Sequence, residues 1–214
     1  KSSVSKPPDP PVDTTSATTK TNEVDVWITT ANQAKLLSKQ TGNLAFGSSA
    51  GGLASIEVDS AQLYQTVDGF GYTLTGGSAT LIHQLPTASR ASLLQELFGT
   101  GSNAIGVSYI RVSIGASDLS ASVFSYNDLP AGQTDENLNN FSLSQDTVDL
   151  IPVLKEILAI NPNIKFLGSP WSAPVWMKDN SNSKGGGLKP MYYTAYANYF
   201  VKYIQAMKAN GITI

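Results

Sequence analysis

From Val67 to its last residue, the sequence repeats one pattern: an apolar β run, a loop and an amphipathic helix. The three units pair strands with helices as follows: 67–75 with 88–98, 107–115 with 146–159, and 164–170 with 192–209. Residues 212–214 then begin a fourth strand. Strands that alternate with helices are typical of βα units, in which helices cover a parallel sheet. The pattern therefore predicts an α/β fold for residues 67–214.

The connections in this region differ greatly in length. Residues 117–145 and 172–191 follow strand ends and are long, whereas 161–163 and 210–211 are short returns from helix to strand. In a (β/α)8 TIM barrel the loops after the strands carry the active site. We expect the N-terminal portion of such a barrel, because 214 residues are fewer than the roughly 250 that a closed barrel takes. A doubly wound sheet with enlarged loops is the alternative.

The residues ahead of these units divide into two parts. Residues 1–22 are rich in Pro, Ser, Thr and Lys and have little to bury, so we expect a disordered tether of an exported protein. A vector-derived or frayed end is the alternative. Residues 23–66 alternate apolar and polar side chains at 24–30, 55–58 and 62–66, which predicts strands before any helix.

Composition limits the partners of the chain. A formal net charge of -2 leaves no broad basic surface for a nucleic-acid backbone. No run approaches the ~20 apolar residues that a transmembrane helix needs. Cysteine is absent, which excludes disulfides, thiolate metal ligands and a cysteine nucleophile from this chain. An uncharged polar ligand fits this composition better.

Two tryptophans form the densest candidate site, in the segment 168–176 (GSPWSAPVW). Two prolines stiffen the backbone there and hold Trp171 and Trp176 near the end of the third strand. An indole offers a flat apolar face and one N–H donor, which suits the C–H face of a sugar ring. We therefore expect a carbohydrate site, with two core tryptophans packed beneath a loop as the alternative.

Charged residues on the second strand add to this site. Arg111 lies within the apolar run YIRVSI, where a guanidinium needs a partner, and Asp118 follows the end of that strand. Arg111 could orient a carboxylate and Asp118 could bind sugar hydroxyls, or both could form structural ion pairs. Because Arg111, Asp118 and Trp171 lie on or after parallel strands, we expect them to share one cavity at the strands' C-terminal edge. His83 belongs to no catalytic triad pattern, and we expect a structural role for it.

At these residues the chain resembles glycoside hydrolase family 30. The stretches that carry the resemblance are VDGFGYTLTGGSA (67–79), SYIRVSIGASDLS (108–120), SPWSAPVWMK (169–178) and YFVKYIQAMKANGI (199–212). The resemblance implies a (β/α)8 barrel with a side β-sandwich, to which the strands of residues 23–66 would belong. It also implies that Asp118 and Trp171 line the glycone subsite, that Trp176 is a second aromatic residue of that loop, and that Arg111 lies beside the nucleophile.

The family resemblance implies a retaining β-glycosidase whose two catalytic glutamates lie beyond Ile214. The sequence resembles bacterial β-1,6-glucanases more than lysosomal glucosylceramidases, so the expected substrate is a β-linked glucan or glucoside. No metal or organic cofactor is implied. We expect an exported protein, whether secreted, periplasmic or a surface lipoprotein, and we expect residues 1–214 alone to be inactive and to need the rest of the barrel as another segment or chain. A non-catalytic surface carbohydrate-binding protein is the alternative.

Overall fold

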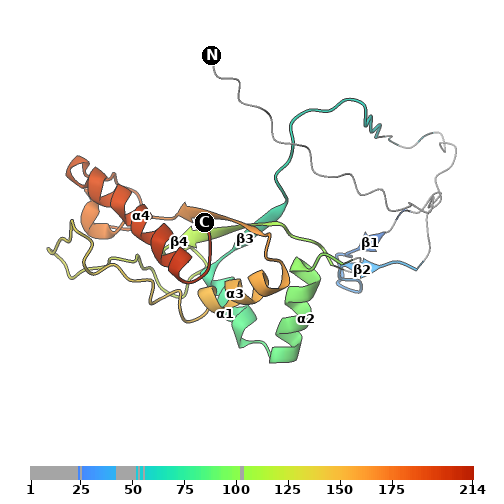
Figure 1. Cartoon of the computed structure of the whole chain (residues 1–214), viewed down its shortest axis with the longest axis horizontal. Helices are drawn as coiled ribbons and strands as arrows, with labels where there is room; N and C mark the ends of the chain where they lie inside the picture. Colours follow the sequence, from blue (N-terminus) through green and yellow to red (C-terminus); the bar gives the residue numbers. More distant parts are fainter. Residues whose placement is uncertain (1–23, 25, 42–51, 53, 55, 102–103) are drawn as a thin grey trace, which may run out of the picture. The chain divides into compact units, whose positions relative to one another are not determined.

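The computed structural model describes residues 24, 26–41, 52, 54, 56–101 and 104–214 (Figure 1). The chain divides into two compact units, Lys1–Tyr64 and Gln65–Ile214, and each is described by itself. The expected tether at residues 1–22 lies outside the described residues. None of the described helices is long and apolar enough to span a membrane.

The first unit contains one short hairpin. Strand β1 (Trp27–Ile28) pairs antiparallel with β2 (Ser38–Lys39). The Nζ of Lys39 lies 5.2 Å from the centre of the Trp27 ring. Residues 56–58 and 62–66, in contrast to the prediction, form no strand with any described residue. Alternation of side chains is not enough for a strand, because its backbone groups need a neighbouring strand to pair with.

The second unit is built on three parallel strands in the order β3-β4-β5. They are β3 (Gly71–Leu74), β4 (Tyr109–Ile114) and β5 (Lys165–Pro170). The bounds of β4 and β5 lie within two residues of the prediction, whereas β3 begins four residues later than predicted. The register places Thr73, Arg111 and Leu167 side by side across the sheet. Strands β3 and β4 approach so closely that a Cβ at Gly71 would lie 1.4 Å from the carbonyl oxygen of Tyr109. Glycine is therefore required at Gly71, as expected for close backbone approach at a barrel strand.

In the described part of this unit, helices α1, α2 and α3 lie between the strands, and two 3-10 helices and α4 follow β5. They are α1 (Gly76–Gln84), α2 (Thr87–Phe98), α3 (Leu150–Ile160), η1 (Val175–Met177), η2 (Pro190–Tyr192) and α4 (Tyr193–Ala209). Helices α2 and α4 match the prediction within one residue. Helix α3 begins four residues later than predicted, since residues 146–149 form turns ahead of it. Residues 212–214 form no strand within the described chain, although Ile212 is buried.

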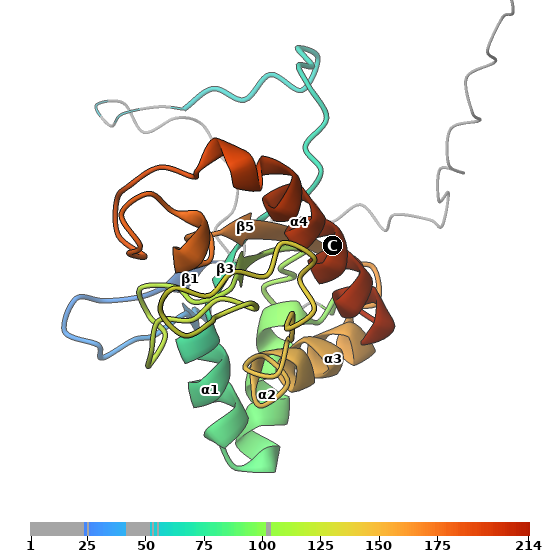
Figure 2. The same cartoon turned by 90° about the vertical axis from the view of Figure 1, so that its left-hand side faces the viewer.

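The two faces of the sheet differ in what they carry. Ile110, Val112 and Ile114 are buried on the helix side of β4. The opposite face carries Arg111 and Leu167, which are both exposed. Figure 2 shows α1, α2 and α3 grouped on one side of the strands, with α4 beside them. This is the arrangement of successive units of a (β/α)8 barrel, in which helices lie outside and the other face of the strands lines the interior.

Polar contacts fasten α1 and α2 to α3. The Nδ1 of His83 lies 2.8 Å from Asp149, to which Thr80 also donates at 2.6 Å. Arg90 pairs with Glu156 at 2.9 Å. The hydrogen bonds from Thr80, first, and from His83 lower the pKa of Asp149. The contact of His83 is a structural one, in line with the expectation from the sequence.

Candidate functional site

Arg111 lies in the middle strand of the sheet, on the face away from the helices. Its guanidinium donates to Ser169 of β5 at 2.9 Å and to Thr73 of β3 at 3.5 Å. Alternation along β4 puts it there, because its neighbours Ile110 and Val112 are both fully buried against the helices. Among the described residues Arg111 has no carboxylate partner. A guanidinium held by two hydroxyls in this way is oriented and free to bind an anionic group.

Trp171 follows the C-terminal end of β5 and is 38% exposed. It lines a hollow of about 370 Å³ together with Ser172, Lys178 and Tyr196. Lys178 is only 7% exposed, and its ammonium donates to Ser172 at 3.2 Å and to the backbone oxygen of Ser183 at 3.0 Å. The lysine thereby ties the loop after η1 to the residue that follows Trp171. An exposed indole with hydrogen-bond donors nearby is suited to a sugar ring.

Trp176, by contrast, is buried, with 7% of its surface exposed. Its indole Nε1 donates to the backbone oxygen and to Oδ1 of Asn127, both at 3.0 Å. Its ring meets Tyr192 edge to face, with centroids 4.9 Å apart. Trp176 therefore packs in the core beneath the loop, which was the alternative to a carbohydrate site. Its role in substrate binding stays a prediction.

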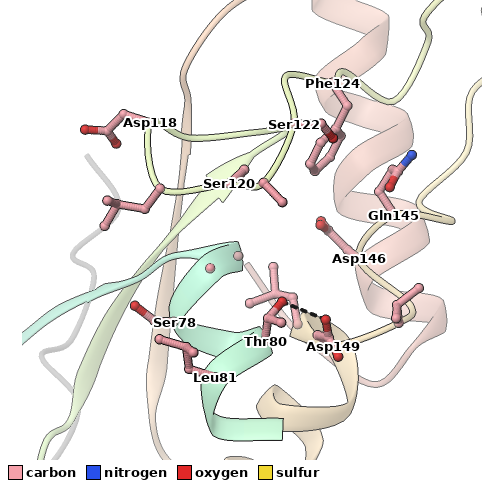
Figure 3. Close-up of a pocket in the computed structure, with 16 residues that line it drawn as sticks. Ser78, Thr80, Leu81, Asp118, Ser120, Ser122, Phe124, Gln145, Asp146 and Asp149 are labelled. Carbon is pink, nitrogen blue, oxygen red and sulfur yellow. Dashed lines mark hydrogen bonds between the residues drawn. The ribbon is translucent and has the colours of Figure 1, made fainter. Parts of the chain in front are cut away.

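Asp118 lies in the long connection between β4 and α3 and is exposed. It borders a cavity of about 610 Å³ between this loop, α1 and the start of α3 (Figure 3). Figure 3 shows its carboxylate directed away from Asp146 and Asp149, which line the same cavity. Gly77 of α1 fits against the loop so closely that a Cβ there would lie 2.0 Å from the backbone oxygen of Leu119.

A buried carboxyl lies within that cavity wall. Asp146 is 5% exposed and accepts a short hydrogen bond from the hydroxyl of Tyr126. Burial raises the pKa of Asp146 to about 6, and the hydrogen bond from Tyr126 offsets part of that rise. Tyr126 itself stacks on Tyr203 and Tyr199 of α4, with centroids 5.6 and 5.9 Å away. Asp146 therefore connects the long loop, the aromatic core and the cavity.

The long loop is also fastened internally. Asp135 accepts hydrogen bonds from the backbone and side chain of Asn140, at 2.7 and 3.1 Å, and from Asn127 at 3.0 Å. These donors, the Asn140 backbone above all, lower the pKa of Asp135 to about 2. The connection from Asp135 through Asn127 to Trp176 fixes two loops at the same edge of the sheet.

The predicted site residues thus gather at one edge without sharing one hollow. Asp118 and Trp171 follow the C-terminal ends of neighbouring parallel strands, and Arg111 lies on the strand between β3 and β5. Asp118 and Trp171 line different hollows. The described residues supply three of the eight strands of a barrel, so the interior surface that would join these positions is incomplete.

Sequence reasoning missed Lys178 and Asp146. Lys178 ends the motif SPWSAPVWMK, and a lysine directly after the apolar residues VWM was an available signal. Asp146 had no such signal, because its partner Tyr126 is 20 residues away and its burial depends on α4.

Comparison with known proteins agrees with this geometry. The model of the glycosyl hydrolase family 30 TIM-barrel domain matches residues 67–214. An endo-1,6-β-D-glucanase of Neurospora crassa is 40% identical over 156 residues, which cover 70% of this chain and 32% of that protein. The lysosomal acid glucosylceramidase of Mus musculus is 35% identical over 156 residues, covering 70% of this chain and 29% of that protein.

Comparison with solved structures also finds a β-1,6-glucanase. The endo-β1,6-glucanase BT3312 superposes with a TM-score of 0.70 at 37% identity, and the match covers 90% of this chain and 41% of that one. The chain spans about a third of the length of the curated relatives that it matches, with values of 32%, 31% and 35% for three of them. The match to the family 30 TIM-barrel domain and the superposition on BT3312 confirm the α/β barrel fold that the sequence predicted.

Proposed function

The chain belongs to glycoside hydrolase family 30, and we propose that the whole protein is a retaining β-glycosidase that cleaves β-glucosidic bonds. The proposed substrate is a β-1,6-glucan, with a glucosylceramide-like glucoside as the second choice. The similarity to endo-1,6-β-glucanases at 40% and 37% identity supports this order. One observation carries the site assignment: the exposed indole of Trp171 stands at the C-terminal end of β5, beside the strand that carries Arg111.

The residues of this chain would bind and orient the sugar. Trp171 would border the sugar ring, and Asp118 would accept hydrogen bonds from its hydroxyls. Arg111, held by Ser169 and Thr73, would keep the nucleophile ionised and aligned. Trp176 would support the loop from below through Asn127. Hydrogen bonds that strengthen toward the oxocarbenium-like transition state contribute to rate as well as to affinity.

The reaction itself needs two further carboxyls. Retaining glycosidases use one as nucleophile and one as acid and then base, about 5–5.5 Å apart. We assign these roles to two glutamates beyond Ile214, as the family resemblance implies. The rest of the barrel, supplied by another segment or chain, would bring them to the edge where Trp171 and Asp118 lie.

We further propose that the protein is exported, as a secreted, periplasmic or surface-anchored enzyme. The Pro, Ser and Thr-rich residues 1–22 support this, because such a segment suits a tether between an attachment point and a folded domain.

The test is an assay of the whole protein on β-1,6-glucan and on aryl β-glucosides, with the anomeric form of the first product followed by NMR. We expect hydrolysis with the β-anomer released first, and no turnover by residues 1–214 alone. Inverted product would contradict the retaining mechanism. Sugar binding without any hydrolysis would favour the non-catalytic carbohydrate-binding alternative.

A further inference from the structure

Lys178 is a buried cation in the connection that follows β5. It is 7% exposed, and among the described residues it pairs with no carboxylate. Its ammonium group donates instead to the hydroxyl of Ser172 at 3.2 Å and to the backbone oxygen of Ser183 at 3.0 Å. Lysine is rarely buried without such partners. These two oxygens therefore hold the ammonium group in the interior.

The ammonium group joins two distant parts of this connection. Ser172 lies six residues before Lys178 in the chain, and Ser183 lies five residues after it. Ser172 directly follows Trp171, and Pro170 directly precedes it. The proline ring restricts the backbone on one side of Trp171, and the contact of Ser172 with Lys178 restricts it on the other. The backbone of Trp171 is thereby held from both sides.

The loop of residues 179–187 is fastened internally. The backbone N–H of Asp179 donates to the backbone oxygen of Gly187 at 3.0 Å, and the N–H of Gly187 donates back to Oδ1 of Asp179 at 2.9 Å. Gly185 and Gly186 have φ angles of 60° and 70°, in the left-handed region that favours glycine. The loop can therefore act as a firm wall beside the end of β5.

This loop and Trp171 form two walls of one hollow. Trp171, Ser183 and Gly186 all line the space of about 370 Å³. Lys178 and Ser172 line it as well, so the contacts of the ammonium group determine how the two walls face each other. The indole of Trp171 is 38% exposed. An exposed side chain gains most from stacking on a ligand when its neighbours already restrict its orientation.

We propose that Lys178 is a positioning residue for Trp171, which it holds through Ser172 and beside the loop of residues 179–187, so that the indole meets a sugar ring in one orientation. This role rests on the proposed function, in which Trp171 borders the sugar. Lys178 acts through Trp171 and touches no reacting atom. Without its ammonium group, the indole would have to be ordered when the sugar binds, and the affinity for the sugar would fall.

The first measurement is steady-state kinetics of the whole protein on aryl β-glucosides. Lys178→Met keeps an unbranched side chain and removes the ammonium group. We expect it to raise KM about fivefold and to change kcat less than about twofold, because the oriented indole contributes to ground-state and transition-state binding alike. A merely structural lysine would reduce the folded fraction, which lowers the apparent kcat and leaves KM unchanged. Lys184→Met, the same substitution at an exposed position of the same loop, is the matched control and should leave both constants unchanged.

A double-mutant cycle tests whether Lys178 acts through Trp171. In a Trp171→Ala background, Lys178→Met should lower kcat/KM by less than about twofold further, because the residue that it positions is gone. Ser172→Ala removes one of the two acceptors of the ammonium group and should raise KM in the same direction, but by less. Full additivity of the Trp171 and Lys178 substitutions would overturn the proposal.

A spectroscopic readout makes the test independent of turnover. With fluorotryptophan incorporated into the whole protein, the fluorine NMR signal of Trp171 is the one that disappears in Trp171→Phe. We expect Lys178→Met and Ser172→Ala to shift or broaden that signal and Lys184→Met to leave it in place, with circular dichroism confirming that each variant folds. An unmoved signal in folded Lys178→Met or Ser172→Ala would overturn the positioning role. Absence of turnover in the unmodified protein would instead overturn the proposed function, and the fluorine signal would still decide whether Lys178 positions Trp171.

Discussion

The indole of Trp176 donates to two oxygens of Asn127, one from the backbone and one from the side chain, both at 3.0 Å. Asn127 belongs to the loop after β4 and Trp176 to the loop after β5, so this contact joins two successive loops at the C-terminal edge of the sheet. The amide of Asn127 then donates to Asp135 at 3.0 Å. The arrangement of the candidate site therefore depends on a buried polar connection between its loops.

The first prediction separates the two tryptophans of the motif. Trp176→Phe should lower the free energy of unfolding by about 2–4 kcal/mol, because it leaves a small void and removes the donor to Asn127. Trp171→Phe is the matched control and should change it by less than about 1 kcal/mol, since Trp171 is 38% exposed. Urea unfolding of both variants measures the difference. Equal losses would contradict the assignment of Trp176 to the core.

The second prediction concerns Asp135 at low pH. Its pKa is lowered from 3.8 to about 2, so the folded state favours the ionised carboxyl. The stability that it contributes is present above about pH 4 and is lost as the pH falls toward 2. Asp135→Asn should cost about 2 kcal/mol at pH 7 through weaker hydrogen bonds to Asn127 and Asn140, and that cost should shrink on acidification. Denaturant titrations across pH 2–7 measure both effects, and Glu136→Gln, at an exposed neighbour, is the control and should cost little stability at pH 7.

Most of the barrel units could be predicted from the sequence because their signal is local. The apolar stripe of α2 and the apolar run YIRVSI of β4 each predict their element from residues close together in the sequence. The local signal for helix α1 is weaker, because this helix opens on Gly76 and Gly77, which are poor helix formers. Its start depends instead on Thr75, whose hydroxyl accepts from the backbone N–H of Ser78 at 3.1 Å.

The site could be predicted only in part, for a similar reason. Trp171 and Trp176 both stand within two residues of a proline, and nothing in that spacing says which indole is buried. The answer depends on Asn127, which lies 49 residues before Trp176 in the chain. Contacts between residues so far apart in the chain leave no periodic pattern in the sequence.

The third prediction tests Asp146 through stability. Its pKa in the folded chain is about 6, above the ordinary 3.8, so the folded state binds this proton more tightly than the unfolded chain does. The resulting stabilisation is present below about pH 4 and is lost as the pH rises through 6. The stability of the unmodified protein minus that of Asp146→Asn should therefore fall by on the order of 3 kcal/mol from pH 4 to 7. Asp135 and Asp149 titrate in both proteins and cancel in this difference, and a flat difference would show that Asp146 titrates normally.

The fourth prediction uses two adjacent glycines at the start of α1. Gly77→Ala should cost about 2 kcal/mol, because its Cβ would lie 2.0 Å from the backbone oxygen of Leu119 and would push the loop away. Gly76→Ala should be neutral or stabilising, since its Cβ would meet only the hydroxyl of Ser120, at 3.4 Å. Thermal melts of the two variants provide the measurement. Similar melting temperatures would mean that the loop yields freely.

The last prediction concerns Asp118 and the proposed glycosidase activity. Asp118 is exposed and lies after the C-terminal end of β4, so its removal takes away little packing. In the whole protein, Asp118→Asn should lower kcat/KM for aryl β-glucosides at least tenfold, because a hydroxyl contact that strengthens in the transition state is weakened. The melting temperature should stay within the range of ordinary surface substitutions. Glu136→Gln, on the same loop but outside the predicted site, should leave both quantities unchanged. If Asp118→Asn instead kept normal kinetics and melted early, Asp118 would be a structural residue of the loop, and the glycone subsite would have to be assigned without it.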